Sequence, residues 1–388
     1  MENESIISKN FSGWKIGLAI FVSVAIASYL LYSALSTKQY IKVADGQGTH
    51  KWFDANKNGK ADLYEEIEFH KNKYGDYYQL NLYDSLKEIN WTTQSYFYFL
   101  LAILLMVSRD FFYVVRIRLL TKNELSWKSS IYVILIWEFA SALTPGVVGG
   151  AAIAMFILNK EKIPLGRSTA IVFITAMMDN LFYIVLIPIV FLFISTEDLF
   201  PQKLSGNDGL MWFFWSGFGL IFCIGLFLFL AIFIWPKLAS KFIKSLFSLP
   251  ILRKWKPRAI QTGHDLETTS RVMRKEPFSF WLKVFGATLL SWISRYLVIN
   301  ALLQAFIGFG LFEHFQLLGK QLILWLFMLV SPTPGGSGVA EYAFSELLAP
   351  YTTSAILLAG LAIIWRLISY FPYLFIGAII LPRWLKKK

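Results

Sequence analysis

The sequence contains few charged residues for its length. Only 16% of its 388 residues are charged, whereas 56% are hydrophobic. A soluble domain of this length covers its core with charged side chains, so water cannot be the main solvent of this chain. The composition therefore excludes an ordinary soluble protein and predicts a polytopic integral membrane protein.

Cysteine and histidine are also scarce. Cys223 is the only cysteine, which excludes an intrachain disulfide and a thiolate metal site. The 4 histidines are scattered without metal-ligand spacing, and no nucleophile elbow or phosphate-binding glycine loop occurs. We therefore expect no catalytic residue and no enzymatic activity. A membrane-embedded transferase acting on a lipid phosphate is a weaker alternative, because no convergent acid–base set stands out.

Apolar runs long enough to cross a bilayer recur along the chain. A hydrocarbon core of about 30 Å needs about 20 helical residues. Helices are expected because backbone polar groups in lipid must be satisfied within their own segment. The first run is too long for a cleavable signal, so it is interpreted as a retained span. The expected spans are 13–35, 93–115, 168–194, 211–235, 278–307 and 354–381.

The net charge of +12 would suggest nucleic acid as the partner of a soluble protein. Here the basic residues cluster in short segments beside apolar spans, which is the positive-inside pattern. The pattern predicts anionic lipid headgroups as partners, and no nucleic acid. It places the basic segment 237–277 and both termini in the cytoplasm, and the polar segment 37–92 outside. We expect a multi-pass protein of a bacterial cytoplasmic membrane, and the pattern does not indicate an oligomeric state.

Two further apolar stretches are each broken at the middle by proline and glycine. Residues 144–150 interrupt the first stretch and residues 331–338 interrupt the second. The charge rule makes each a re-entrant hairpin, and the two enter from opposite faces. The alternative is that they are kinked ordinary helices. The predicted fold class is an all-α membrane protein with about six transmembrane helices and two hairpins in an inverted repeat. Its expected units are 1–36, 37–92, 93–236, 237–277 and 278–388.

The paired breaks predict a cavity near the middle of the membrane. Non-helical backbone at that depth is tolerated only where protein buries it or where it lines a polar cavity. Half-helix ends there present N–H groups and the positive end of the helix dipole, which suit a phosphate or carboxylate. The break residues that we expect to contact a substrate are Pro145, Gly146, Pro334, Gly335 and Gly336.

Five ionisable residues lie within apolar runs: Glu138, Asp179, Arg295, Glu341 and Arg366. A charge at such a position costs roughly 2.5 to 3.5 kcal/mol even on lenient insertion scales, so each needs a partner. We expect Arg295 and Arg366 to hold an anionic headgroup, with the three carboxylates as counter-charges. Pairs of Asp179 with Arg295 or Arg366 are plausible. The alternative is a set of closed ion pairs that only lock the helices together.

The external segment contains a calcium-loop pattern. Residues 54–65 fit the EF-hand template D-x-[DN]-x-[DN]-G-x5-E, and Gly59 supplies the sharp turn. A short incoming helix is expected around Thr49 to Phe53. We expect weak, structural calcium binding at about 10⁻⁴ to 10⁻³ M. The alternative is a solvated turn that binds no calcium. The expected ligands are Asp54, Asn56, Asn58, the Lys60 carbonyl, Asp62 and Glu65.

Three stretches resemble the lysylphosphatidylglycerol synthase transmembrane family, also called flippase-like: Ser141–Gly146 with Gly149 and Gly150, Ser331–Glu341, and Trp365–Pro372. The resemblance covers about 95–381. It implies a lipid flippase that moves an anionic, aminoacylated or polyprenyl-linked lipid between leaflets. Family members that make the aminoacyl lipid carry a soluble transferase domain after the membrane domain. The sequence stops at Lys388, so synthase activity is not expected. A non-transporting scaffold or calcium-responsive sensor is the alternative function.

Overall fold

The computed structural model describes residues 38–386 and five isolated positions before them. Within that range it leaves out 56, 58, 60, 62, 64–65, 81–88, 90, 145, 201–207, 249–255, 332, 334 and 353. The expected span 13–35 therefore lies almost wholly outside the described residues. The described secondary-structure elements that follow residue 92 are all helical.

The first half of this helical part runs from α4 to α10. A capping box of Thr92 and Ser95 starts α4, and the Ser126 side chain caps α5 by accepting a hydrogen bond from the backbone N–H of Ser129. Because the residue before a proline avoids helical geometry, α5 ends where Thr144 turns extended. The elements are α4 (Thr93–Leu120), α5 (Trp127–Leu143), α6 (Gly146–Lys160), α7 (Leu165–Phe193), α8 (Thr196–Leu199) and α10 (Asp208–Phe229).

The second half starts with a π-helical turn, η2 (Leu230–Ile234), which ends α10. Its helices are α11 (Pro236–Leu246), α12 (Lys256–Met273), α13 (Phe278–Gln304), α14 (Leu311–Val330), α15 (Val339–Leu348), α16 (Ala355–Ser369) and α17 (Phe371–Lys386), with the short turn η4 (Ala349–Tyr351) between α15 and α16.

Five described segments are long and apolar enough to cross a membrane. They are Thr93–Leu120, Leu165–Phe193, Phe214–Ile234, Phe278–Gln304 and Ile356–Lys386. Their order agrees with the five spans expected after residue 37. On α4, the apolar side chains of Leu100, Leu104 and Val107 are exposed on one face, as expected where lipid is the solvent. The expected polytopic helical architecture is confirmed.

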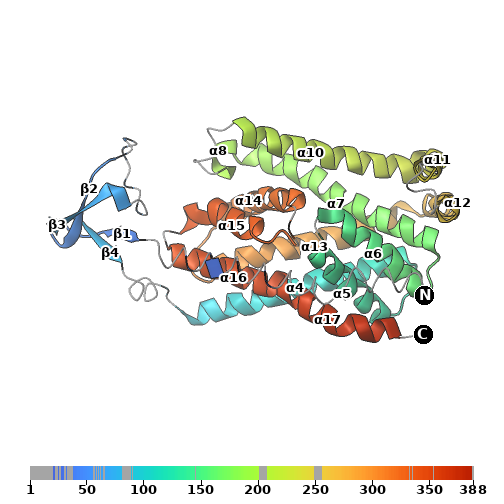
Figure 1. Ribbon diagram of the computed structural model, residues 1–388, viewed down its shortest axis with the longest axis horizontal. Helices are drawn as coiled ribbons and strands as arrows, with labels where there is room; N and C mark the ends of the chain where they lie inside the picture. Colours follow the sequence, from blue (N-terminus) through green and yellow to red (C-terminus); the bar gives the residue numbers. More distant parts are fainter. Residues whose placement is uncertain are drawn as a thin grey trace.

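Both expected breaks separate two helices. The first lies between α5 and α6, which pack against each other, and the second lies between α14 and α15. In Figure 1, α5 and α6 lie toward one end of the long helices, whereas α14 and α15 lie toward the other. The two helix–break–helix pairs thus approach the middle of the bundle from opposite ends.

The last expected span, 354–381, is interrupted, which the sequence analysis did not anticipate. Tyr370 leaves the helical region at ψ −57° and φ −128°, so α16 ends and α17 begins with a change of direction. Pro372 follows at the second position of α17, where the N–H that proline lacks would have no partner within the helix. A third broken helix therefore approaches the middle of the bundle.

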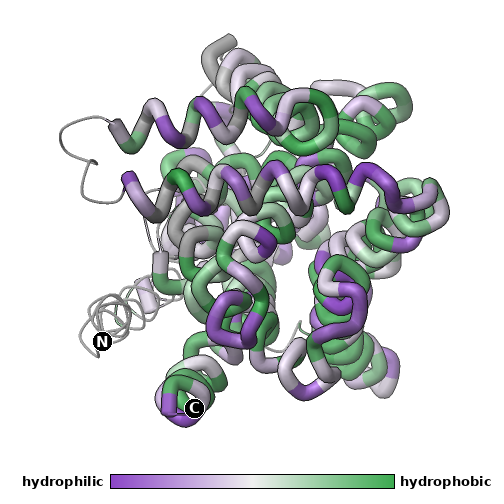
Figure 2. The backbone as a smooth tube through the Cα atoms, turned by 90° about the vertical axis from the view of Figure 1, so that its right-hand side faces the viewer, coloured by the Kyte–Doolittle hydropathy of each residue, from purple (hydrophilic) through white to green (hydrophobic). Residues whose placement is uncertain are grey.

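The described residues of the basic segment 237–277 include two helices, α11 and α12, that pack together. Seen end-on in Figure 2, both run across the ends of the long helices. The Ser240 side chain lies against Gly263, where a Cβ would come within 2.6 Å of Ser240 Oγ. The described residues of this basic segment therefore form a helical pair across one end of the bundle.

The external segment forms a small antiparallel sheet in place of helices. Its strands are β1 (Gln39–Lys42), β2 (Gly48–Trp52), β3 (Phe69–Gly75) and β4 (Tyr77–Leu80), in the order β1-β4-β2-β3, with the short turn η1 (Glu66–Glu68) before β3. Figure 1 shows the sheet beyond the end of the bundle where α14 and α15 lie. The helix expected at Thr49 to Phe53 is wrong, because β2 occupies residues 49–52. The all-α prediction therefore holds for the membrane part and not for this segment.

Buried apolar side chains form two main clusters within the bundle. One cluster centres on α7, α13, α14, α15 and α16, and includes Phe182, Leu302 and Phe344. The other centres on α4, α5, α6 and α17, and includes Phe139 and Leu374. Each cluster surrounds one of the two helix breaks. Polar side chains from both groups of helices meet between them.

Candidate functional site

A cavity of about 360 Å³ lies between the two broken helix pairs. Thr144 lines it at the first break, and Gly335 and Gly336 line it at the second. Tyr370, at the third break, is also part of its wall. Backbone that leaves the helical conformation therefore meets at one cavity, as the paired breaks predict.

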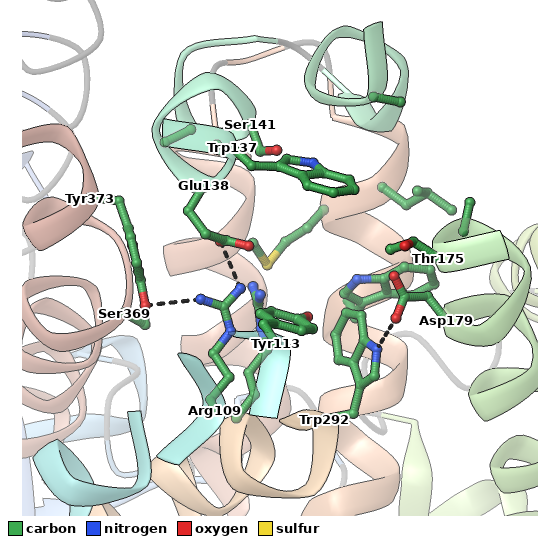
Figure 3. A pocket seen from close by; sticks show the side chains of 18 of the residues that line it. Arg109, Tyr113, Trp137, Glu138, Ser141, Thr175, Asp179, Trp292, Ser369 and Tyr373 are labelled. Atoms are coloured by element: carbon green, nitrogen blue, oxygen red, sulfur yellow. Dashed lines mark hydrogen bonds and ion pairs between the residues drawn. The ribbon is translucent and has the colours of Figure 1, made fainter. Parts of the chain in front are cut away.

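Arg109 of α4 holds one side of the cavity (Figure 3). Its guanidinium is almost completely buried, with Nη2 2.6 Å from Glu138 Oε2 and Nη1 2.9 Å from Asp110 Oδ1. The same Nη1 donates to the Tyr373 hydroxyl at 2.9 Å, and this hydroxyl donates to Asp110. One arginine thus forms ion pairs with two carboxylates, Asp110 of α4 and Glu138 of α5, and its hydrogen bond to Tyr373 links these helices to α17.

Asp179 of α7 forms a second ion pair. Its Oδ1 lies 2.5 Å from Arg116 Nη1 and accepts a hydrogen bond from Trp292 Nε1 at 2.8 Å. Arg116 also donates to the Thr288 hydroxyl of α13. The expected partners of Asp179, Arg295 and Arg366, are therefore wrong. The crossing of α4, α7 and α13 brings Arg116 to this carboxylate first.

Arg366 of α16 stabilises the backbone of the second break. Both of its Nη atoms donate to the Gly335 carbonyl at 3.1 Å, and Nη2 donates to Ser337 Oγ at 2.9 Å. Its Nε lies 2.9 Å from Glu341 Oε1, with side-chain exposures of 4% and 2%. Glu341 Oε2 accepts from the Gly338 N–H at 2.6 Å at the start of α15. Glu341 is thus buried behind Arg366 and does not line the cavity.

Arg295 of α13 is the remaining arginine of the cavity wall. It is half-buried, and its guanidinium lies 5.4 Å from the centre of the Trp292 ring. Within the described part of the chain, no carboxylate lies within 4 Å of it and no hydrogen bond satisfies it. Among the four arginines that line the cavity, Arg295 is therefore the cation available to a ligand.

Aromatic rings form much of the remaining wall. The Tyr183 ring stacks on Trp325 with ring centres 3.7 Å apart, and Tyr183 is also hydrogen-bonded to Tyr296. The Tyr113 ring lies between Arg109 and Arg116, 4.6 Å from each guanidinium carbon. The aromatic side chains that line the cavity are Tyr113, Trp137, Tyr183, Trp292, Trp325, Trp365, Tyr370 and Tyr373. Such walls suit both apolar groups and cations.

Some of the expected site residues are not among those described. Pro145 and Pro334 lie outside the described residues, while Gly146 starts α6 next to the cavity residue Thr144. Gly335 and Gly336 have φ values of +57° and +68°. These left-handed conformations explain why the second break requires glycine.

Sequence reasoning missed Arg109, Asp110, Arg116 and Tyr373 as site residues. Arg109 lies within the expected span 93–115 and Arg116 lies one residue beyond it, and neither was among the expected site residues. The helix continues to Leu120, so both arginines lie within it. Their spacing of seven residues, with Tyr113 between them, places the three side chains on one helix face. That spacing was the signal available in the sequence.

The calcium-loop pattern can be followed only in part. Asp54 Oδ2 accepts a hydrogen bond from the Gly59 N–H at 2.9 Å, and Gly59 has a φ of +73°. The other expected ligands, Asn56, Asn58, Lys60, Asp62 and Glu65, lie outside the described residues. The turn at Gly59 has the geometry that the pattern predicts, and the expectation of calcium binding stays a prediction.

Comparisons with known proteins agree with the motifs in the sequence. The family model described as "Lysylphosphatidylglycerol synthase TM region" matches residues 81–377. A "UPF0104 membrane protein" from Archaeoglobus fulgidus is 25% identical over 308 residues, which cover 76% of this chain and 87% of that protein. No solved structure matches the chain. The matched residues include the cavity and all three breaks.

Proposed function

Because the chain belongs to the lysylphosphatidylglycerol synthase transmembrane family, we propose that it is a lipid transporter. In this proposal, an anionic, aminoacylated or polyprenyl-linked lipid moves between the leaflets of a membrane. Its headgroup crosses through the cavity between the broken helices, and its acyl chains stay in the lipid. The protein acts without a catalytic residue.

The observation that supports this proposal is a cavity lined by arginines inside an apolar helical bundle. Four arginines line it, although each intramembrane charge is costly, and one of them, Arg295, has no carboxylate partner in the described part of the chain. A bundle that only needed closed ion pairs would leave neither a cavity of about 360 Å³ nor an unpaired arginine. We therefore favour transport over a non-transporting scaffold or calcium-responsive sensor.

The three ion-paired arginines have roles that differ from that of Arg295. Arg366 is bonded to Gly335 and Glu341, so it positions the second break. Arg109 and Arg116 join α4 to α5 and α7. We propose that Arg295 contacts the headgroup directly and that Glu138 and Asp179 are the carboxylates nearest to it.

The external loop and the orientation belong to the same proposal. We propose that calcium binds at residues 54–65 and stiffens the segment that carries the sheet. We also propose that this segment faces the exterior of a cytoplasmic membrane, with α11, α12 and both termini inside. The densest basic residues then face the leaflet rich in anionic lipid, which supports this orientation.

Lipid translocation in reconstituted vesicles tests the proposal. Acyl-labelled fluorescent phospholipids are incorporated into both leaflets, and an external quencher reports the fraction that becomes accessible with time. Wild-type protein is expected to accelerate translocation over protein-free vesicles, and Arg295→Ala to abolish most of the acceleration. The matched control is Glu313→Gln, because Glu313 is exposed at the start of α14. Translocation that equals the protein-free rate, or an Arg295→Ala variant as fast as the control, would contradict the proposal.

A further inference from the structure

We propose that the cavity selects a zwitterionic headgroup, one that carries a phosphate diester and a primary ammonium group and has no net charge. This inference rests on the proposed transport function and changes its substrate class to a zwitterionic lipid. It differs from the expectation drawn from the sequence, in which the arginines hold an anionic headgroup. The difference comes from where the carboxylates lie in the structure.

The cavity and its direct ionic partners have no net charge. Four arginines line it, and four carboxylates lie in or directly behind its wall: Asp110, Glu138, Asp179 and Glu341. Two of the arginines, Arg116 and Arg366, are each neutralised by one carboxylate. The charges that remain are Arg295, without a carboxylate, and Arg109, with two. A site that is neutral but internally polarised matches a ligand of the same kind.

The negative part of the cavity lies around Arg109. Asp110 and Glu138 both contact this guanidinium, and their side chains keep 26% and 22% exposure. Asp110 accepts hydrogen bonds from Arg109 Nη1 and the Tyr373 hydroxyl, and two donors suit an ionised carboxylate, which only accepts. Within the described residues, Glu138 Oε1 makes no hydrogen bond. It is an acceptor that a ligand ammonium can use.

An aromatic ring stands next to this acceptor. Trp137 precedes Glu138 on α5 and also lines the cavity, where Figure 3 shows the two side chains on the same wall. No other aromatic ring or cation contacts Trp137 in the part of the chain that the structure describes. Indole is the best of the aromatic faces for binding a cation. A carboxylate with a free oxygen beside a half-buried indole ring that lines the cavity is a suitable environment for an ammonium group.

The positive part of the cavity lies on α13, which packs against α4. Arg295 on α13 lies at the same level along the helices as Arg109 on α4. Ser291 Oγ donates to the Arg109 carbonyl at 3.0 Å, and the Ser108 and Ser294 hydroxyls are 3.2 Å apart. These contacts bring the α13 turn that carries Arg295 beside the α4 turn that carries Arg109. A headgroup in the cavity can therefore place its phosphate at Arg295 and its ammonium at Glu138.

The penalty for a charged ligand makes this arrangement selective. A headgroup with a net charge of −1 would leave one charge uncompensated at membrane depth, where such a charge is costly. A headgroup that carries both signs satisfies Arg295 and Glu138 together. We therefore expect wild-type protein to translocate an acyl-labelled phosphatidylethanolamine faster than the matching phosphatidylglycerol, by about tenfold or more.

The test compares these two probes in the same preparation of reconstituted protein. The ratio of their rates does not depend on the fraction of protein that folds, so it remains informative for destabilised variants. Glu138→Gln should lower the ratio at least severalfold, because it makes the cavity net positive. The control Glu313→Gln should leave the ratio unchanged. Glycerophosphoethanolamine trapped inside the vesicles should stay there, which identifies the whole lipid as the ligand.

The outcomes separate this inference from the proposed function. If neither lipid is translocated above the protein-free rate, the transport function itself fails and the inference falls with it. If both lipids are translocated and phosphatidylglycerol is as fast or faster, transport stands and the selectivity is wrong. An unchanged ratio in Glu138→Gln also overturns the selectivity. Release of trapped glycerophosphoethanolamine overturns the lipid as the source of the headgroup.

Discussion

The buried pair of Glu341 and Arg366 allows a quantitative prediction. The two side chains have only 2% and 4% exposure, and Nε lies 2.9 Å from Oε1. Glu341→Gln keeps the shape of the side chain and leaves an acceptor for the Gly338 N–H, but it removes the charge. Arg366 is then an uncompensated buried cation, and breaking a buried pair from one side costs about 3–5 kcal/mol of unfolding free energy.

A matched exposed pair provides the control. Glu124 lies 2.7 Å from Arg167, but its side chain is 51% exposed. An exposed pair contributes no more than about 1 kcal/mol, so Glu124→Gln should change stability little. Unfolding from mixed micelles with increasing sodium dodecyl sulfate, followed by tryptophan fluorescence, measures both variants.

A double-mutant cycle then isolates the pair. Adding Arg366→Gln to Glu341→Gln should cost less than the sum of the two single changes, because the second substitution removes the stranded cation. The reasoning is refuted if Glu341→Gln costs no more than Glu124→Gln, or if the two substitutions in the pair are simply additive.

Two other changes have defined outcomes. Gly335→Ala should destabilise the protein strongly in the same unfolding assay, because φ is +57° and a Cβ would lie 2.1 Å from Tyr370 Cε2. Its control is Gly286→Ala, which has open space around it and an ordinary helical φ and should be neutral or slightly stabilising. Burial, together with Lys71 and Lys38, lowers the pKa of His50 in the external sheet below 6.5. The sheet should therefore be fully stable above about pH 6.5 and lose stability as the pH falls from there toward the lower pKa. Hydrogen exchange of the β2 amides, corrected for intrinsic rates, measures this loss. Exchange protection that is unchanged or rises on acidification would contradict this assignment.

The general architecture could be predicted because its signals are local. Lipid-crossing helices need long apolar runs, and a helix break needs proline or glycine, so both can be recognised within a short window of sequence. The position of the cavity followed from the two breaks. The interruption at Tyr370 was less visible, because Pro372 is a single residue within an otherwise continuous apolar run.

The pairing of the charges could not be predicted, because it depends on how helices cross. Asp179 is sixty-three residues from Arg116, and nothing local distinguishes this partner from Arg295. The helix crossing that joins Ser291 to the Arg109 backbone decides which side chains meet. For the same reason, the sequence did not show that Arg366 donates hydrogen bonds to the Gly335 carbonyl or that Arg295 has no carboxylate partner in the described part of the chain.

The external sheet was missed because one motif outweighed the local pattern. The calcium-loop template implies flanking helices, but residues 48–52 alternate between buried and exposed side chains as a strand does. Gly48 and Gly75 face the neighbouring strands, where a Cβ would lie 2.4 Å from the Tyr77 carbonyl oxygen and 2.0 Å from the His50 carbonyl oxygen, respectively. These glycines permit the close approach of strands that holds the sheet together.

The most direct test of the central claim is whether the cavity holds a lipid through Arg295. Native mass spectrometry of the protein released from nanodiscs that contain phosphatidylethanolamine and phosphatidylglycerol measures the retained lipid. The account predicts a phospholipid adduct on wild-type protein and on Glu313→Gln, with phosphatidylethanolamine enriched, and loss of the adduct in Arg295→Ala. Equal retention of lipid by Arg295→Ala and wild-type protein would contradict it.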